Sequence, residues 1–276
     1  MSIGVHTNSS ALIALQNLNS TADQLTQTQE RISTGLNISS AKDNASVWAI
    51  AQGQRADIGA LGAVKMSLDR ATSISDVAAT AGQSISDLLV QMKQKVVAGM
   101  DPSLDTASRT ALNNDYQSLL KQVQSTMDNA EFDGANLLNG SITNNVQFIA
   151  NADGSQTITL SVKDMTLGGS IITMGATSSI TTVAAASLVL GQLDASITNV
   201  NTALGQMGSD ANQISTHEDF VSKLMDVLTT GVGKLVDADM AKESASLQAL
   251  QVQQQLGAQA LSIANSQPQI VLSLFK

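Results

Sequence analysis

The sequence predicts a mainly α-helical fold, a long antiparallel helical rod with a small β-hairpin insertion, and three observations support this fold class. Apolar residues repeat at alternating spacings of three and four over several long stretches, as they do along the seams of packed helices. The 276 residues include only 2 prolines and no cysteine, so helices can run without interruption and no disulfide or thiolate metal site is expected. Fourteen Lys and Arg stand against 23 Asp and Glu, and this net charge of −9 argues against a nucleic-acid partner.

The first helix is expected close to the N-terminus. An apolar seam begins there at Ala11 and ends at Leu36, and Gln29 is its single polar member. The seam consists of Ala11, Leu15, Leu18, Ala22, Leu25, Gln29, Ile32 and Leu36.

A second and longer seam runs from Leu61 to Val96. Small residues in its middle allow a partner helix to approach closely. We expect this helix to end near Gly99 and Asp101-Pro102 to cap a third helix over about 104–129, because proline is favoured in the first turn of a helix.

The middle of the chain, about residues 131–182, lacks helical periodicity. Apolar and polar residues alternate in 146–150 and again in 158–162, with Asp153-Gly154 between them, which predicts a β-hairpin. The stretch 166–182 is rich in Gly, Ser and Thr and is expected to form a surface loop or short strands.

Two further helices are expected after the hairpin. A seam from Leu193 to Leu235 predicts the first, with Thr181 or Thr182 as its N-cap and Glu218 as the one charged residue in the seam. The last helix carries two apolar stripes, so it needs more than one neighbour. One stripe consists of Leu247, Leu250, Gln254, Gly257, Leu261 and Ala264, and the other of Val252, Leu256, Ala260 and Ile263.

Both ends of the chain lack charge. No Asp, Glu, Lys or Arg occurs in 1–22 or in 244–275. These ends are either flexible polar tails or segments that become buried, and burial is favoured because charged residues are depleted from the cores of interfaces. Two isolated helices would be marginally stable, so we expect them to fold on assembly with neighbouring copies. A head-to-tail contact that does not close into a ring would produce a filament.

The sequence contains neither a secretory signal nor a membrane-spanning segment by inspection. The first basic residue is Arg31, whereas a signal peptide needs early basic residues, and no run of 18 apolar residues occurs. We therefore expect no membrane partner.

Several motifs carry a resemblance to a known family. Residues 31–36 (RISTGL) and the block Ser40-Ala41-Lys42-Asp43-Asn44-Ala45 resemble a signature of bacterial flagellins. The segment 131–140, with Phe132 and Gly134, resembles the family sequence that opens its hairpin. The segments 236–243 and 264–276 are similar to the entry and the end of the family's C-terminal helix.

The resemblance implies a structural subunit that polymerises, alone or with sibling flagellins, into the extracellular flagellar filament used for swimming. It implies export through the flagellar type III apparatus with an export chaperone, and contacts with the filament cap and hook-associated proteins. The terminal helices would line the inner tube of the filament. The implied inner-tube residues are Leu15, Leu18, Leu25, Ile32, Leu247, Leu250, Leu256, Leu261, Ile263, Leu272, Leu274 and Phe275.

These expectations divide the chain into five parts. Residues 1–36 and 240–276 would form the inner-tube helices, which would pair as a coiled coil on polymerisation. Residues 37–140 and 183–239 would form the rod, and 141–182 a short hairpin with a variable surface loop.

No residue pattern indicates catalysis, a cofactor or a metal site, so we expect a protein that is not an enzyme. His217 is expected on a solvated face. The serines and threonines of the middle segment are either polar loop residues or O-glycosylation sites, as some similar flagellins carry. The candidates are Thr143, Ser170, Thr173, Thr177, Ser178 and Ser179. Two alternatives remain at this point, a hook–filament junction protein and a coiled-coil signalling rod.

Overall fold

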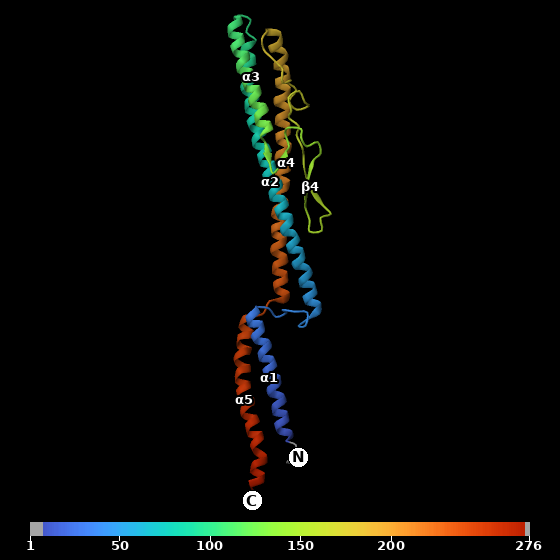
Figure 1. Cartoon of the computed structure of the whole chain (residues 1–276), viewed down its shortest axis with the longest axis vertical. Helices are drawn as coiled ribbons and strands as arrows, with labels where there is room; N and C mark the ends of the chain where they lie inside the picture. The colour runs from blue at the N-terminus through green and yellow to red at the C-terminus, as the bar shows by residue number, and fades with distance from the viewer. Residues whose placement is uncertain (1–7, 274–276) are drawn as a thin grey trace. The chain divides into compact units, whose positions relative to one another are not determined.

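The computed structural model describes the backbone of residues 8–273 and the side chains of residues 8–266. It confirms a mainly α-helical fold with two short antiparallel strand pairs (Figure 1). The elements are α1 (Ser9–Thr34), α2 (Ala45–Gly99), α3 (Thr106–Asp128), β1 (Glu131–Phe132), β2 (Ala135–Asn136), β3 (Val146–Ile149), β4 (Thr157–Leu160), α4 (Val183–Val236) and α5 (Met240–Ser273).

Two compact units divide the chain. We call residues 57–226 the central unit and residues 1–56 with 227–276 the terminal unit. The long helices α2 and α4 contribute to both.

The core of the central unit lies between α2, α3 and α4, which run side by side in Figure 1. Every member of the seam predicted from Leu61 to Val96 is buried, which confirms that seam. On α4 the predicted seam holds through Val200, Met207, Ile214 and Val221. Its terminal part, within the terminal unit, is wrong at Leu235, which is exposed, because the buried position there is the adjacent Val236.

Small residues bring α2 and α4 close together. A Cβ atom added at Gly82 would lie 2.8 Å from Cδ2 of Leu204 on α4, a distance that real Cβ contacts do not show. The leucine therefore occupies space that only glycine leaves free.

By length and composition, α4 is the one described helix apolar enough to cross a membrane, with an 18-residue window of mean hydropathy 1.2. Buried helices in globular proteins reach the same value, and Val189, Leu193 and Val200 of α4 are buried in the central unit. Core packing accounts for part of this hydropathy, because 28% of that window is buried.

The corner between α2 and α3 differs from the prediction in its cap. Helix α2 ends at Gly99 as expected, but α3 begins only at Thr106, with Asp105 as its N-cap. The Asp105 carboxylate accepts a hydrogen bond from Ser108 N at 2.7 Å, whereas Asp101 accepts from Ser103 N within the connecting turn. Asp105 is the N-cap because it directly precedes the first helical residue, whereas residues 102–105 separate Asp101 from that residue.

Arg109 holds this corner together from inside. Its side chain is buried and donates hydrogen bonds to the carbonyl oxygens of Gly99 and Asp101. The last carbonyls of a helix lack partners within that helix, so the guanidinium supplies the missing donors.

The middle segment folds onto the helices of the central unit. β3 and β4 pair in antiparallel register, with Phe148 opposite Ile158, which confirms the predicted hairpin. Thr182 caps α4, because its hydroxyl accepts from Ala185 N at 3.1 Å. The expected surface loop over 166–182 is wrong in part, since Ile172, Met174 and Ile180 are fully buried. These three apolar side chains lie between small polar residues in the sequence, and each is buried in the central unit because its removal from water is favourable.

We predict that Arg109→Met destabilises the protein by about 2–3 kcal/mol, because the carbonyl groups of Gly99 and Asp101 lose their charged donor while most of the packing remains. Denaturant unfolding monitored by circular dichroism measures the change. Lys121→Met, an exposed substitution on α3, is the matched control. Equal stabilities of the two variants would contradict the role assigned to Arg109.

Candidate assembly surface

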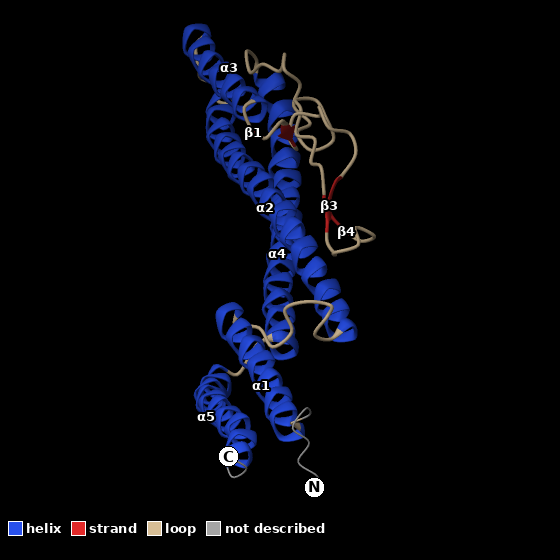
Figure 2. Ribbon diagram, turned by 60° about the horizontal axis from the view of Figure 1, so that its bottom comes forward, coloured by secondary structure: helices blue, strands red, loops and turns tan. Residues whose placement is uncertain are grey.

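Helices α1 and α5 form an antiparallel pair in the terminal unit (Figures 1 and 2). At one end of the pair, Asn8 Nδ2 donates to the carbonyl oxygen of Ala264 at 2.7 Å. At the other end, Arg31 and Glu243 form an ion pair with 3.3 Å between Nη1 and Oε1. Asn8 also caps α1 by accepting from Ala11 N, so one side chain both starts the helix and ties it to its partner.

The face of α1 that meets α5 differs from the predicted seam at two positions. Leu18, Leu25 and Ile32 are half-buried as members of it, but Leu15 and Gln29 are exposed. Two threonines, Thr21 and Thr28, are the most buried described residues of α1 instead. These positions were missed because threonine is not counted as apolar.

Thr21 is compatible with a buried position because its hydroxyl donates to Asn17 O, one turn earlier in the same helix, at 2.9 Å. The polar atom is thus satisfied locally, and the remaining methyl group is available for packing against α5.

The first predicted stripe of α5 faces α1. Leu247, Leu250 and Leu261 are half-buried there. A Cβ atom added at Gly257 would lie 3.2 Å from Leu18 Cδ1, so α1 packs directly against the backbone of α5 at this point.

The second stripe of α5 lies exposed, together with apolar residues of α1. Exposure ranges from 42% for Leu15 to 65% for Ile263. The exposed set consists of Leu12, Ile13, Leu15, Val252, Leu256 and Ile263, and we call it the exposed apolar set. Leu12 and Ile13 were not among the predicted residues, because they lie outside the seam. Their position in the uncharged segment 1–22 is the sequence feature that could have identified them.

A groove of about 450 Å³ separates the two helices within this set. Its apolar lining comes from Ile13, Ala14 and Leu18 on α1 and from Leu256, Gly257 and Ala260 on α5. Burying an exposed leucine or isoleucine stabilises a complex by about 1.5–3 kcal/mol before the costs of association. The groove can therefore receive apolar side chains of another helix.

The two segments that connect the terminal helices to α2 and α4 are joined by backbone hydrogen bonds. The amides of Asn37 and Ile38 donate to Val236 O, and the amide of Ala238 donates to Gly35 O. Gly35 closes α1 in the left-handed conformation, with φ of 72°, which favours glycine. Because both connections are tied to each other, the entry to α5 is held beside the end of α1.

The block 40–45 has a structural role in this connection. Asp43 Oδ2 accepts hydrogen bonds from the amides of Ser39 and Ser40 at 3.0 and 2.9 Å and from both hydroxyls. The Ser40 amide, followed by the Ser39 hydroxyl, holds the pKa of Asp43 below its usual value. Asn44 Oδ1 accepts from Val47 N at the start of α2, while Ala41, Lys42 and Ala45 are exposed.

The second motif forms a tight turn in the central unit. Asp133 and Gly134, with φ of 50° and 76°, connect β1 to β2, and positive φ at both central residues is typical of a type I′ hairpin turn. Asp133 Oδ2 lies 2.8 Å from Arg70 Nε on α2. Phe132 is partly exposed beside this turn.

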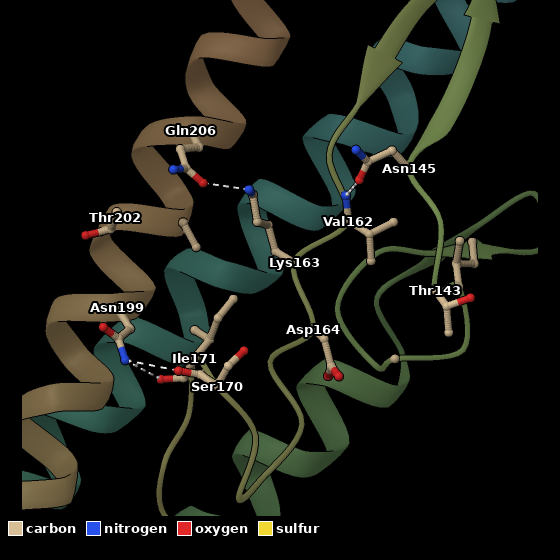
Figure 3. Close-up of a pocket in the computed structure, with 13 residues that line it drawn as sticks. Thr143, Asn145, Val162, Lys163, Asp164, Ser170, Ile171, Asn199, Thr202 and Gln206 are labelled. Atoms are coloured by element: carbon tan, nitrogen blue, oxygen red, sulfur yellow. Dashed lines mark hydrogen bonds between the residues drawn. The ribbon is translucent and has the colours of Figure 1, made fainter.

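Two of the six hydroxyl candidates lie at a groove of about 570 Å³ between the middle segment and α4 (Figure 3). Thr143 and Ser170 line this groove and are exposed, and Thr177 is exposed elsewhere. Thr173 and Ser178 have engaged hydroxyls: Thr173 Oγ1 donates to Gln192 O at 2.9 Å, and Ser178 Oγ lies 2.7 Å from the Tyr116 hydroxyl. Ser179 is half-buried.

The side chains of Leu272, Leu274 and Phe275 lie outside the described residues. His217 is half-buried rather than solvated, because its Nε2 lies 2.6 Å from Ala150 O of the hairpin. Within residues 8–266, no cluster of three His, Asp or Glu side chains is arranged to hold a metal ion.

A helical pair that leaves large apolar side chains exposed is typical of one class of protein, the self-assembling structural subunit. Residues 5–143 match the bacterial flagellin N-terminal helical region and residues 190–275 the bacterial flagellin C-terminal helical region. The chain belongs to the bacterial flagellin family and is a structural subunit of the flagellar filament.

Relatives and solved structures agree with this assignment. The chain is 51% identical to Flagellin FljJ of Caulobacter vibrioides over 100% of its own length and 99% of the relative, and 41% identical to a flagellin of Brucella melitensis over 98% of both. Bacillus cereus flagellin matches with a TM-score of 0.51 and 20% identity over 56% of this chain and 88% of that one. A hook-associated protein from Vibrio parahaemolyticus, described as putative, matches with a TM-score of 0.60 and 14% identity over 71% and 100%. These two structures share the fold.

We predict that Asp43→Ala accelerates amide exchange across residues 36–46 roughly tenfold, because the turn loses its common acceptor. Hydrogen–deuterium exchange by mass spectrometry measures it, with Lys42→Ala as the neighbouring exposed control. Since the pKa of Asp43 is lowered, its contribution persists above the ordinary aspartate pKa and is lost as the pH falls through the lowered value, so exchange in the wild type, corrected for intrinsic rates, should approach that of the variant in acid. Equal exchange in both variants would contradict this assignment.

Proposed function

We propose that the exposed apolar set of α1 and α5 is the surface through which this subunit joins its neighbours in the filament. Flagellins polymerise with copies of themselves, so the occupant of the surface is the terminal pair of another subunit. The single observation that carries the proposal is the exposure of six large apolar side chains on two helices whose facing segments are almost free of charge.

Energetic reasoning supports this assignment. An exposed apolar face of this kind normally marks an interaction site, because monomeric proteins rarely keep such faces uncovered. Charged side chains would have to be desolvated at a buried contact, and 244–275 contains none. The α1–α5 pair covers one face of each helix, and the second stripe of α5 is left for a neighbour.

The predicted residues then divide by role. Leu18, Leu25 and Ile32 would act with Leu247, Leu250 and Leu261 within the pair. Leu15, Leu256 and Ile263 would act between subunits, joined by Leu12, Ile13 and Val252. We retain Leu272, Leu274 and Phe275 in the proposed surface on the strength of the family motif alone.

We propose the five-part division as functional layers. Residues 1–36 and 240–276 would line the inner tube, 37–140 with 183–239 would form the rod, and 141–182 would lie outside. Helix bounds support the divisions near 36 and 240, since α1 ends at Thr34 and α5 begins at Met240. The compact units divide elsewhere, at 56 and 227, because the first turns of α2 and the last turns of α4 pack with the terminal unit.

The flagellar filament of the family is extracellular, and we propose that this chain reaches it through the flagellar export apparatus with an export chaperone. Cap and hook-associated proteins would meet the same terminal helices at the ends of the filament. Sibling flagellins with matching terminal helices would enter the same polymer. Membership of the family supports each of these partners. No observation favours a junction protein, a signalling rod or an enzyme.

We predict that Leu256→Glu blocks polymerisation while the monomer keeps its helical content, because the side chain is exposed in the monomer and would carry a charge into the contact. The critical concentration should rise at least about tenfold, since the loss of one buried leucine alone costs about 1.5–3 kcal/mol. Seeded assembly followed by pelleting and electron microscopy measures it.

Gln255→Glu is the matched control, because it places the same charge one residue away on an exposed position outside the stripe. It should polymerise much closer to the wild type than Leu256→Glu does. Assembly of Leu256→Glu at the wild-type concentration would remove the stripe from the proposed surface.

We also propose that Thr143, Ser170 and Thr177 are sites of O-glycosylation. Exposed hydroxyls support this choice, while the engaged hydroxyls of Thr173 and Ser178 argue against those two. In filaments purified from cells, peptide mass mapping should place added hexose-like mass on peptides carrying the first three residues. A glycan on Thr173 or Ser178, or an unmodified intact mass, would refute the proposal.

A further inference from the structure

Glu218 is the one acidic residue in the seam of α4. The neighbouring seam residues Ile214 and Val221 are buried in the central unit, and Glu218 itself is half-buried. A carboxylate between buried apolar residues loses part of its hydration. The residue opposite Glu218 on α2 therefore decides whether the negative charge is stable there.

The register between α2 and α4 identifies the opposite residue. Three cross-helix contacts define it: Lys65 Nζ with Ser222 Oγ at 3.4 Å, Ser86 Oγ with Asn201 Oδ1 at 3.2 Å, and Lys93 Nζ with Asp194 Oδ1 at 2.7 Å. The second and third pairs lie three and four whole heptads beyond the first on α2, and as many before it on α4.

The antiparallel register is therefore constant over this length. Asp69 lies four residues after Lys65 and Glu218 four residues before Ser222, so the register places the two carboxyl groups opposite each other. No lysine or arginine occupies either of these two opposed positions.

The same stretch of α2 contains other poorly satisfied polar groups. Within the described chain, the buried hydroxyls of Thr72 and Ser75 have no hydrogen-bond partner. These residues lie one and two turns beyond Asp69. An interface with unsatisfied buried polar groups contributes less to stability than an apolar one. A repulsion between charges at this place is therefore opposed by weaker packing.

We propose that a proton on Glu218, opposite Asp69, forms a pH-sensitive lock across the α2–α4 interface in the central unit. With this proton in place, the Glu218 carboxyl donates to Asp69 and the helices are held together. When the proton leaves, the half-buried Glu218 carboxylate faces the exposed carboxylate of Asp69 and the packing loosens.

The surroundings set the sign of the effect. Lys65 on α2 favours the ionised form of Glu218, whereas Asp69 on α2 and Asp219 on α4 oppose it; on the other side of α4, His217 faces the hairpin. Desolvation first, and Asp69 second, raise the pKa of Glu218 above its usual value. A raised pKa in the folded state means that the contribution is present below the ordinary glutamate pKa and is lost as the pH rises through the raised value.

The test uses the whole chain as a monomer, so it does not depend on polymerisation. Thermal unfolding is followed by circular dichroism between pH 4 and pH 8.5 for the wild type and Glu218→Gln. At pH 8 the variant should melt about 2–4 °C above the wild type, because the amide keeps the volume and removes the repulsion. The difference should disappear near pH 4, where Glu218 of the wild type holds its proton.

Two further variants separate the lock from a general charge effect. Asp226→Asn removes an exposed carboxylate from the same helix and should leave the pH profile of the wild type unchanged. Asp69→Asn should reproduce the gain at pH 8, and the double variant Asp69→Asn/Glu218→Gln should gain no more than either single variant, because one removal already ends the repulsion.

Three results would overturn the proposal. One is a Glu218→Gln variant less stable than the wild type at pH 8, which would mean that the carboxylate is stabilised there by Lys65. Another is additive gains in the double variant. The third is the same pH-independent shift in Glu218→Gln and Asp226→Asn.

Discussion

A helix buries an apolar face only where another helix lies against it, and in this chain the number of neighbours differs between the two units. α2 and α4 have one another, α3 and the middle segment, so the seams of the central unit are covered within the chain. In the described part of the terminal unit α1 packs against α5, and a single partner covers a single face. The exposed apolar set is the consequence, and under the proposed function a neighbouring copy supplies the missing face.

The positions where prediction succeeded and failed follow from the same constraint. The seam from Leu61 to Val96 was predictable residue by residue, because a helix covered along one line produces a regular heptad pattern. On α1 the seam was right at Leu18 and Leu25 and wrong at Leu15, because apolar residues on that helix serve two faces and the pattern of one obscures the other. Thr21 could not be found from hydrophobicity, since its hydroxyl is satisfied inside its own helix.

Irregular segments were less predictable for a different reason. The hairpin was marked by Asp153-Gly154 and by alternation, which act locally. The burial of Ile172, Met174 and Ile180 depends on the surface of helices far away in the sequence, so a composition rich in Gly, Ser and Thr indicated only a surface loop or short strands. Asp43 illustrates the intermediate case: its motif was recognisable, but its role as the common acceptor of a turn required the positions of Ser39 and Ser40.

The placement of the assembling helices at opposite ends of the sequence has a consequence for synthesis. Leu18 meets Gly257 only after almost the whole chain has been made, so the proposed assembly surface is completed only at the end of synthesis. A product that stops before α5 leaves α1 without its partner and lacks half of the exposed apolar set. Under the proposed function, completeness of translation is therefore a condition for entering the polymer.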